Sequence, residues 1–131
     1  MKGLFITDNL LNYREPDTWI DLPKALFGDS EGLFVAVADG NGMCKAGIFD
    51  GDLMIIDAGA TPESGDIAVV MVNGEPVCRR ILFDNHSVTI RREDGRTPDI
   101  VSDTCIIMGV VVQTVRHLRK GGAPWSERTS A

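Results

Sequence analysis

The chain has 131 residues, of which 44% are hydrophobic and 24% charged, and its formal net charge is −6. A chain of this length fits one domain that buries most of its unfolded surface in a single core. No apolar run reaches the roughly 18 residues that a membrane span needs. The stretch Met1–Asp8 meets polar residues too early for a signal peptide, so we expect a cytoplasmic protein with no membrane contact.

The acidic charge is unevenly distributed along the chain. Residues 1–66 carry 12 acidic and 4 basic side chains, whereas residues 67–131 carry 7 acidic and 9 basic ones. Neutralisation of phosphates supplies most non-specific affinity for DNA, which an acidic domain does not offer. We therefore expect no direct sequence-specific binding to DNA.

Cysteine and histidine spacing excludes the common metal frameworks. Cys44, Cys78 and Cys105 form no CxxC pair and leave an odd count, and His86 and His117 lie far from all three in sequence. Neither a disulfide framework nor a zinc site follows from this spacing. We expect no metal and no cofactor.

The first segment, residues 1–32, is expected to be an N-terminal arm. Pro16 and Pro23 favour extended or turning backbone, with a short helix around Ala25–Phe27 that ends at Gly28. Residues 33–119 are expected to form the folded domain, and residues 120–131 a flexible or loosely docked tail.

Short β-branched runs within 33–119 predict strands, separated by turn signals. Asn73-Gly74 is the strongest hairpin signal, and Asp50-Gly51-Asp52 predicts a tight turn with positive φ at Gly51. One helical turn is expected over Met43–Gly47. The runs predicted as strands are 33–38, 53–57, 67–72, 75–82, 87–92 and 105–115. Such closely spaced strands with almost no amphipathic helix predict a mostly-β barrel or sandwich.

The stretch 40–52 carries the most specific pattern, reading Gly-Asn-Gly-Met-Cys-Lys-Ala-Gly-Ile-Phe-Asp-Gly-Asp. The collinear segments 64–69, 73–80 and 103–111 extend this pattern. Together these stretches resemble the LexA/UmuD family of self-cleaving peptidase domains (S24 type), and their residues are most similar to those of the UmuD branch. The resemblance implies the mostly-β fold of the LexA/UmuD C-terminal domain. It implies a cleft motif made of Gly40, Asn41, Met43, Gly47, Asp50, Gly51 and Asp52.

The resemblance also points to two missing catalytic groups. The family cuts a peptide bond with a serine nucleophile and a buried lysine that acts as general base. Gly42 stands at the nucleophile position and Cys78 at the base position, so no catalytic residues are expected. The arm also lacks the Ala-Gly or Cys-Gly bond that such proteins cut in themselves. The sequence therefore predicts a pseudo-peptidase.

Two sets of residues leave alternatives open. Cys44 and Cys78 are read as small buried core residues or as a relocated nucleophile, for which Lys45 is the only basic neighbour in sequence. Asp39, Asp50 and Asp52 are read as turn formers, with carboxylate catalysis or Ca²⁺ binding as the alternative.

The expected function is that of a catalytically inactive, UmuD-like protein of the SOS response. By resemblance, such a protein is a homodimer that binds a Y-family translesion DNA polymerase and a recombinase filament, and the run Cys105–Val115 offers an apolar edge for dimerisation. The alternatives are an active S24-type peptidase, with a cysteine nucleophile or with residues altered from the natural ones, and a regulator of a LexA-like repressor. Five arginines form either a solvated face or a docking patch: Arg79, Arg80, Arg91, Arg92 and Arg96.

Overall fold

The structure is a computed structural model that describes residues 31–119 and 128–130. The chain divides into two units at the boundary between Ser30 and Glu31, and all of the described residues belong to the second unit. The predicted arm, with its short helix around residues 25–27, lies outside the described residues, as do residues 120–127 and 131 of the predicted tail.

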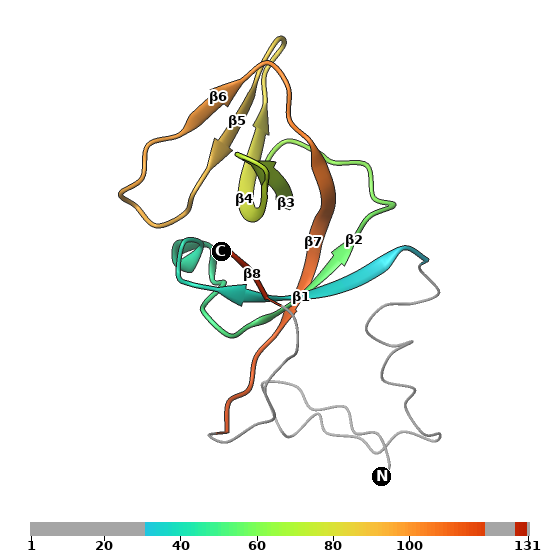
Figure 1. Cartoon of the computed structure of the whole chain (residues 1–131), viewed down its shortest axis with the longest axis vertical. Helices are drawn as coiled ribbons and strands as arrows, with labels where there is room; N and C mark the ends of the chain where they lie inside the picture. Colours follow the sequence, from blue (N-terminus) through green and yellow to red (C-terminus); the bar gives the residue numbers. More distant parts are fainter. Residues whose placement is uncertain (1–30, 120–127, 131) are drawn as a thin grey trace, which may run out of the picture. The chain divides into compact units, whose positions relative to one another are not determined.

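The described residues form eight strands and one short 3₁₀ helix (Figure 1). In chain order these are β1 (Leu33–Asp39), η2 (Cys44–Ala46), β2 (Leu53–Asp57), β3 (Ile67–Val72), β4 (Glu75–Phe83), β5 (Val88–Arg91), β6 (Ile100–Ser102), β7 (Ile107–Val115) and β8 (Arg128–Ser130).

The strands make one sheet that closes on itself. Its order is β3-β7-β2-β1-β8-β4-β5-β6, and β3 also pairs with β4, so six strands form a closed ring from which β5 and β6 extend. The pairings within it are antiparallel except those of β8, which runs parallel to both β1 and β4. Closure of this kind removes most exposed strand edges. The mostly-β prediction is confirmed.

The β3–β4 hairpin is buried on both of its faces. Asn73 (φ 52°) and Gly74 (φ 79°) both lie at positive φ, as a type I′ turn requires. Val69 and Cys78 face each other on one side, whereas Val70 and its partner Val77 lie on the other. Because both faces are covered, the run 67–72 is apolar throughout and does not alternate.

Two hydrophobic cores therefore lie on opposite faces of this hairpin. The first consists of Ala36, Ala38, Met43, Ile48, Met54, Ile56, Val69 and Cys78. The second consists of Ala68, Val70, Val77, Ile81 and Ile90. The first core joins the ends of β1 and β2 to the segment after the glycine-rich turn, and so it positions that segment.

Strand β7 corrects one expectation. It lies between β3 and β2 in the sheet, so its backbone is not the free edge that was expected for dimerisation. Its outward face is nevertheless apolar and exposed: Ile106, just before the strand, is 68% exposed, Met108 42% and Val112 48%. Strand β7 therefore presents an exposed apolar face and not a free backbone edge.

Two short strands differ from the expected pattern. Ile100–Ser102, for which no strand was predicted, forms β6 against β5, and Arg128–Ser130, within the tail expected to be flexible or loosely docked, forms β8. Three-residue strands carry too few positions for a period-two pattern to be recognised. In the described part of the chain no helix is long and apolar enough to cross a membrane.

A glycine at the crossing of β7 and β2 tests this packing. A Cβ added at Gly109 would lie 2.6 Å from Ile56 Cγ2 and 3.1 Å from the Asp57 carbonyl oxygen. We expect Gly109→Ala to lower the free energy of unfolding by about 1–3 kcal/mol, because backbone and a buried side chain must move. Urea titration measures this change. The control Gly59→Ala, whose Cβ would lie 3.4 Å from Asp57 Oδ1 and 3.9 Å from the Glu31 carbonyl oxygen, should change stability by less than about 0.5 kcal/mol.

Candidate functional site

The glycine-rich loop that follows β1 is folded by its own side chains. Asp50 Oδ1 accepts a hydrogen bond from Gly40 N–H at 2.7 Å, and Asn41 Oδ1 accepts one from Asp50 N–H at 3.0 Å. Gly51, at φ 89°, donates its N–H to the Ala38 carbonyl at 2.8 Å. These bonds bring residues 50–51 back beside the end of β1, and the turn predicted at Gly51 is confirmed.

Within this loop, the residues after Gly42 form the predicted single helical turn. Helix η2 is capped by Gly47, which lies in the left-handed region at φ 87° and donates its N–H to the Cys44 carbonyl. Met43 is fully buried, and its carbonyl accepts hydrogen bonds from Ala46 and Ile48. The buried methionine therefore anchors the turn in the first core.

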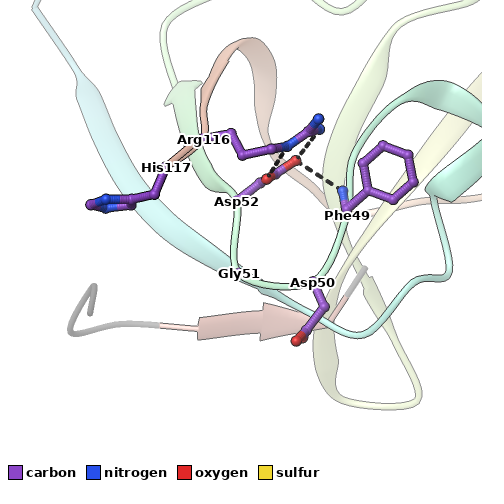
Figure 2. A pocket seen from close by; sticks show the side chains of 6 residues that line it. All are labelled: Phe49, Asp50, Gly51, Asp52, Arg116 and His117. Carbon is purple, nitrogen blue, oxygen red and sulfur yellow. Dashed lines mark hydrogen bonds and ion pairs between the residues drawn. The ribbon is translucent and has the colours of Figure 1, made fainter. Parts of the chain in front are cut away.

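Asp52 is the one buried charged side chain among the described residues, at 1% exposure. Its Oδ2 accepts the Phe49 N–H at 2.9 Å, while Oδ1 and Oδ2 accept Arg116 Nε and Nη2 at 2.7 and 2.8 Å (Figure 2). This bidentate pair supplies the compensation that a buried carboxylate requires. The turn-forming role expected for Asp52 is confirmed, and the ion pair adds to it.

Arg116 follows β7 directly and holds three parts of the loop together. Besides Asp52, it donates Nη2–H to the Gly47 carbonyl at 2.9 Å, and its guanidinium carbon lies 4.6 Å from the centroid of the Phe49 ring. We call the set Gly47, Phe49, Asp52 and Arg116 the arginine clasp. It borders an open hollow of about 360 Å³, which His117 also lines (Figure 2).

The clasp determines the charge state of Asp52. Burial alone would raise the pKa of this carboxyl group, but the hydrogen bonds from Arg116 and Phe49 and the charge of Arg116 outweigh burial. The pKa of Asp52 therefore lies below its usual range, and the side chain is ionised at neutral pH.

The two positions that the resemblance assigns to a catalytic dyad are both buried. Gly42 has no positive φ, so its backbone suits any residue, and its neighbour Met43 packs in the same core as Cys78. Burial raises the pKa of the Cys78 thiol to about 12, against a small opposing effect of Arg79. At neutral pH Cys78 is therefore an uncharged thiol, which is a poor nucleophile and a poor base.

The third candidate group, Cys44, is tied to the loop that follows β5. Its Sγ lies 4.0 Å from the Glu93 carbonyl oxygen, which also accepts the Lys45 N–H at 2.8 Å. Glu93 N–H contacts Met43 Sδ at 3.4 Å, and its carboxylate pairs with Arg80. Glu93 thus fastens the turn after Gly42 to the β4–β5 pair.

The five arginines do not share one face. Arg80 lies directly opposite Arg91 in the β4–β5 register, so these two project to one side. Because side chains alternate along a strand, Arg79 and Arg92 project to the other side. Burial and the charge of Arg92 lower the pKa of Arg79. Arg96 lies in the exposed loop beyond β5.

Three of the five arginines have acidic partners. These pairs are Arg80–Glu93, Arg91–Asp99 and Arg92–Asp94. Arg92 Nε lies 3.1 Å from Asp94 Oδ2 but makes no hydrogen bond, so this contact is an ion pair without hydrogen-bond geometry. Arg79 donates to the carbonyl of its neighbour Cys78 at 2.7 Å. The patch is therefore a partly neutralised basic surface.

Sequence reasoning missed two residues of the site. Arg116 is 64 positions from Asp52, and Glu93 was expected only to lie in a loop. A basic residue directly after the last long strand was the signal for Arg116, because a buried Asp in the loop needs a cation. No comparable signal marks Glu93, three of whose four contacts to the loop and β4 use its backbone.

Comparisons with known proteins agree with this architecture. Residues 6–112 match the Peptidase S24-like family. The LexA repressor of Clostridium acetobutylicum is 28% identical over 101 residues, which are 77% of this chain and 50% of that protein. The LexA repressor of Streptomyces clavuligerus is 34% identical over 97 residues, which are 74% of this chain and 40% of that protein. The chain spans about half the length of the curated relatives it matches.

The closed ring of strands, with a glycine-rich loop held to the residue that follows β7, defines a small β-barrel domain. The chain belongs to the Peptidase S24-like family.

Removal of the clasp should change the response to acid. Stability that comes from a carboxyl group with a lowered pKa is present above the unfolded-state pKa of about 3.9 and is lost as pH falls through the folded-state pKa. In Arg116→Gln, burial dominates and the pKa of Asp52 rises. We therefore expect this variant to unfold at a higher pH than the unmodified protein in an acid titration followed by circular dichroism. Arg119→Gln removes the same charge three positions away and should leave the acid midpoint unchanged.

Proposed function

We propose that this domain is an S24-type pseudo-peptidase that acts through protein contacts. In this proposal it works in the cytoplasm as a UmuD-like subunit of the SOS response, forms a homodimer, and binds a Y-family translesion polymerase at a recombinase filament. The observation that carries the proposal is the combination of an intact scaffold with two absent catalytic groups. Gly42 has no side chain, and the Cys78 thiol is buried with a pKa of about 12.

The scaffold itself supports a role that does not need chemistry. The loop is held by Asp50, Asn41, the arginine clasp and Glu93, none of which depends on a side chain at position 42. A family site can therefore lose its nucleophile and keep its shape. A loop retained in this form remains available as a rigid recognition surface.

The exposed apolar face of β7 supports dimerisation. Met108, Val112 and Val115 are exposed on this strand, together with Val35 on β1. β2 lies between these two strands, and exposed apolar residues that gather on one sheet are a mark of protein contact surfaces. A two-fold pairing is the commonest way to cover such a face.

The arginine patch supports an acidic partner surface. Arg91 and Arg96 are the members best placed for contact, because Arg91 is 42% exposed in its side chain and Arg96 lies in an exposed loop. Rim charges of this kind mainly raise the rate of association and make it sensitive to salt. The docking role of the patch is part of the proposal.

The absence of chemistry is tested directly by incubation with a peptide that contains an Ala-Gly bond. At alkaline pH, where a family lysine would be deprotonated, the unmodified chain should give no product by mass spectrometry. The double variant Gly42→Ser/Cys78→Lys should cut slowly, because it restores a nucleophile and a base together, whereas each single variant stays inert. Cleavage by the unmodified chain that thiol alkylation abolishes would contradict the proposal and favour Cys44 or Cys78 as a nucleophile.

The partner is tested with a purified Y-family polymerase from the same organism. Light scattering should give the mass of a dimer for the chain alone and a larger complex with polymerase. Arg91→Glu/Arg96→Glu should weaken the complex at least tenfold and reduce its sensitivity to salt, whereas Arg119→Glu, outside the patch, should not. A monomer, or unchanged binding by the double variant, would contradict the corresponding part of the proposal.

The curated relatives favour a second candidate. Because they are LexA repressors, the domain could serve as the effector half of a repressor or act on one. In that case the chain would bind a LexA-type repressor in the same light-scattering experiment, and it would not bind the polymerase.

A further inference from the structure

One strand edge remains open after the ring of strands has closed. The sheet order ends at β6, whose pairing within the described part of the chain is with β5 alone. In Figure 1 β6 lies beside β5, on the side away from β4. An open edge is a template for a further strand, and natural proteins usually blunt it with charges, prolines or covering segments. The backbone and side chains of β6 therefore determine what this edge accepts.

The direction of the backbone groups in β5 follows from those in β4. Ile81 directs both its N–H and its carbonyl toward residues 65 and 66, on the β3 side of β4. Because successive residues of a strand point to opposite edges, Leu82 directs its groups toward β5. Leu82 lies opposite Thr89, so these two form a hydrogen-bonded pair and the next residue, Ile90, points toward β6.

The same alternation identifies the outward groups of β6. Ile90 lies opposite Ile100, so Ile100 uses its backbone groups to bond with β5. Val101, the next residue, therefore directs its N–H and its carbonyl away from β5, to the open edge. Asp99 and Asp103, each two positions from Val101, share this direction. The β6 edge thus offers outward backbone groups at alternate residues.

The β6 edge is short because both of its ends are closed. Pro98, directly before it, has no N–H to donate. At the other end, the Ser102 hydroxyl donates to the Thr104 carbonyl at 2.7 Å and accepts the Thr104 N–H at 3.3 Å, so a local turn ends the strand. The open stretch is therefore 99–103, which matches a short extended segment and not a long sheet.

Both faces of the β6 edge carry exposed apolar side chains. Ile100 is 46% exposed and continues outward the row formed by Ile81 and Ile90 of the second core. Val101 is 66% exposed on the opposite face of the sheet. An added strand would cover Val101 with one residue and Ile100 with the next.

The charges around Val101 are acidic. Asp99 and Asp103 share its face of the sheet, because each lies two positions away along the strand. Asp99 pairs with Arg91, whereas Asp103 has no ion pair within the part of the chain that the structure describes. Asp84 follows β4 at the same end of the sheet as Asp103. These carboxylates favour a partner with basic residues.

The same charges disfavour the chain itself as the occupant. If a second copy of β6 paired about a two-fold axis at Val101, Asp99 would lie opposite Asp103 of that copy, and like charges directly opposite destabilise a sheet. A shift of two residues would place a carboxylate opposite Val101 instead. The chain's own residues 1–30 carry five acidic and three basic side chains, so their net charge is also negative.

We propose that the β6 edge binds an extended, basic and apolar segment of a partner protein by strand addition. Main-chain hydrogen bonds at Asp99, Val101 and Asp103 supply the affinity in an antiparallel pairing. Two apolar residues of the segment cover Val101 and Ile100, and a lysine or arginine at each end faces a carboxylate. The β6 edge belongs neither to the β7 face nor to the glycine-rich loop, so this binding goes beyond the proposed function.

The acetylated and amidated peptide Lys-Thr-Val-Ile-Lys tests the site in an NMR titration of the full chain. In antiparallel pairing its central valine lies opposite Val101 and its isoleucine opposite Ile100. We expect amide shifts at residues 100–103 that saturate at millimolar peptide. The peptide Glu-Thr-Val-Ile-Glu should bind about tenfold more weakly at low salt, because its end charges are repelled, and the difference should shrink as salt is added.

Two variants separate the backbone contribution from the charge contribution. Val101→Pro removes the outward N–H and no bond of the β5–β6 ladder, so it should abolish binding while the circular dichroism spectrum stays unchanged. Asp103→Lys should weaken binding of the lysine peptide about threefold, as expected for an exposed pair. The control Glu75→Lys makes the same charge change at the exposed start of β4 and should have no effect.

Several outcomes would overturn the proposal. These are no shift at residues 100–103 with millimolar peptide, equal binding of the two peptides at low salt, and binding that survives in Val101→Pro. Broadening of the same amides with rising protein concentration, in the absence of peptide, would show that a second copy occupies the edge. No readout involves cleavage or a polymerase, so failure here is distinguishable from failure of the proposed function.

Discussion

A single buried carboxylate constrains the whole glycine-rich loop. Asp52 is removed from solvent, and an ionised carboxylate in that position is tolerated only with charged and hydrogen-bonding partners. Arg116 and the Phe49 N–H supply them. The need to satisfy one side chain therefore fixes the position of the loop relative to the end of β7, and with it the position of Gly42. The clasp joins residues that are distant in sequence, so it also holds two parts of the ring together.

This dependence explains which parts of the molecule could be predicted from the sequence. The strands around Asn73-Gly74 and Gly51 were predicted because positive φ leaves a local signature in residue type. The arginine clasp was not predicted, since an ion pair between Asp52 and Arg116 is a property of the closed ring and not of either segment. The same reasoning applies to Glu93, three of whose four contacts with the loop and β4 come from backbone atoms, which carry no residue signature. Strand β8 was not predicted because Arg-Thr-Ser has no apolar alternation. The segment is a strand because it pairs between β1 and β4 in the sheet.

The separation between scaffold and chemistry follows from the same contacts. Burial of Cys78 in the first core shows that a position next to the glycine-rich loop can be filled by a small apolar group without leaving a charge unpaired. A lysine at such a place is expensive unless it is neutral, because burial disfavours its charged form. The uncharged thiol of Cys78 carries no such cost in this core.

The position of β8 in the ring has a consequence for the order of folding during synthesis. Val37 and Arg128 pair although they are about 90 positions apart, and contacts of such high sequence separation form late. A chain that emerges from the ribosome can pair β1 with β2 and β3 with β4 early, but it cannot close the ring until residues 128–130 have emerged. Until then the backbone edges of β1 and β4 remain unpaired, which is a state prone to strand exchange with other chains. The emergence of residues 128–130 thus decides when the ring of strands can close.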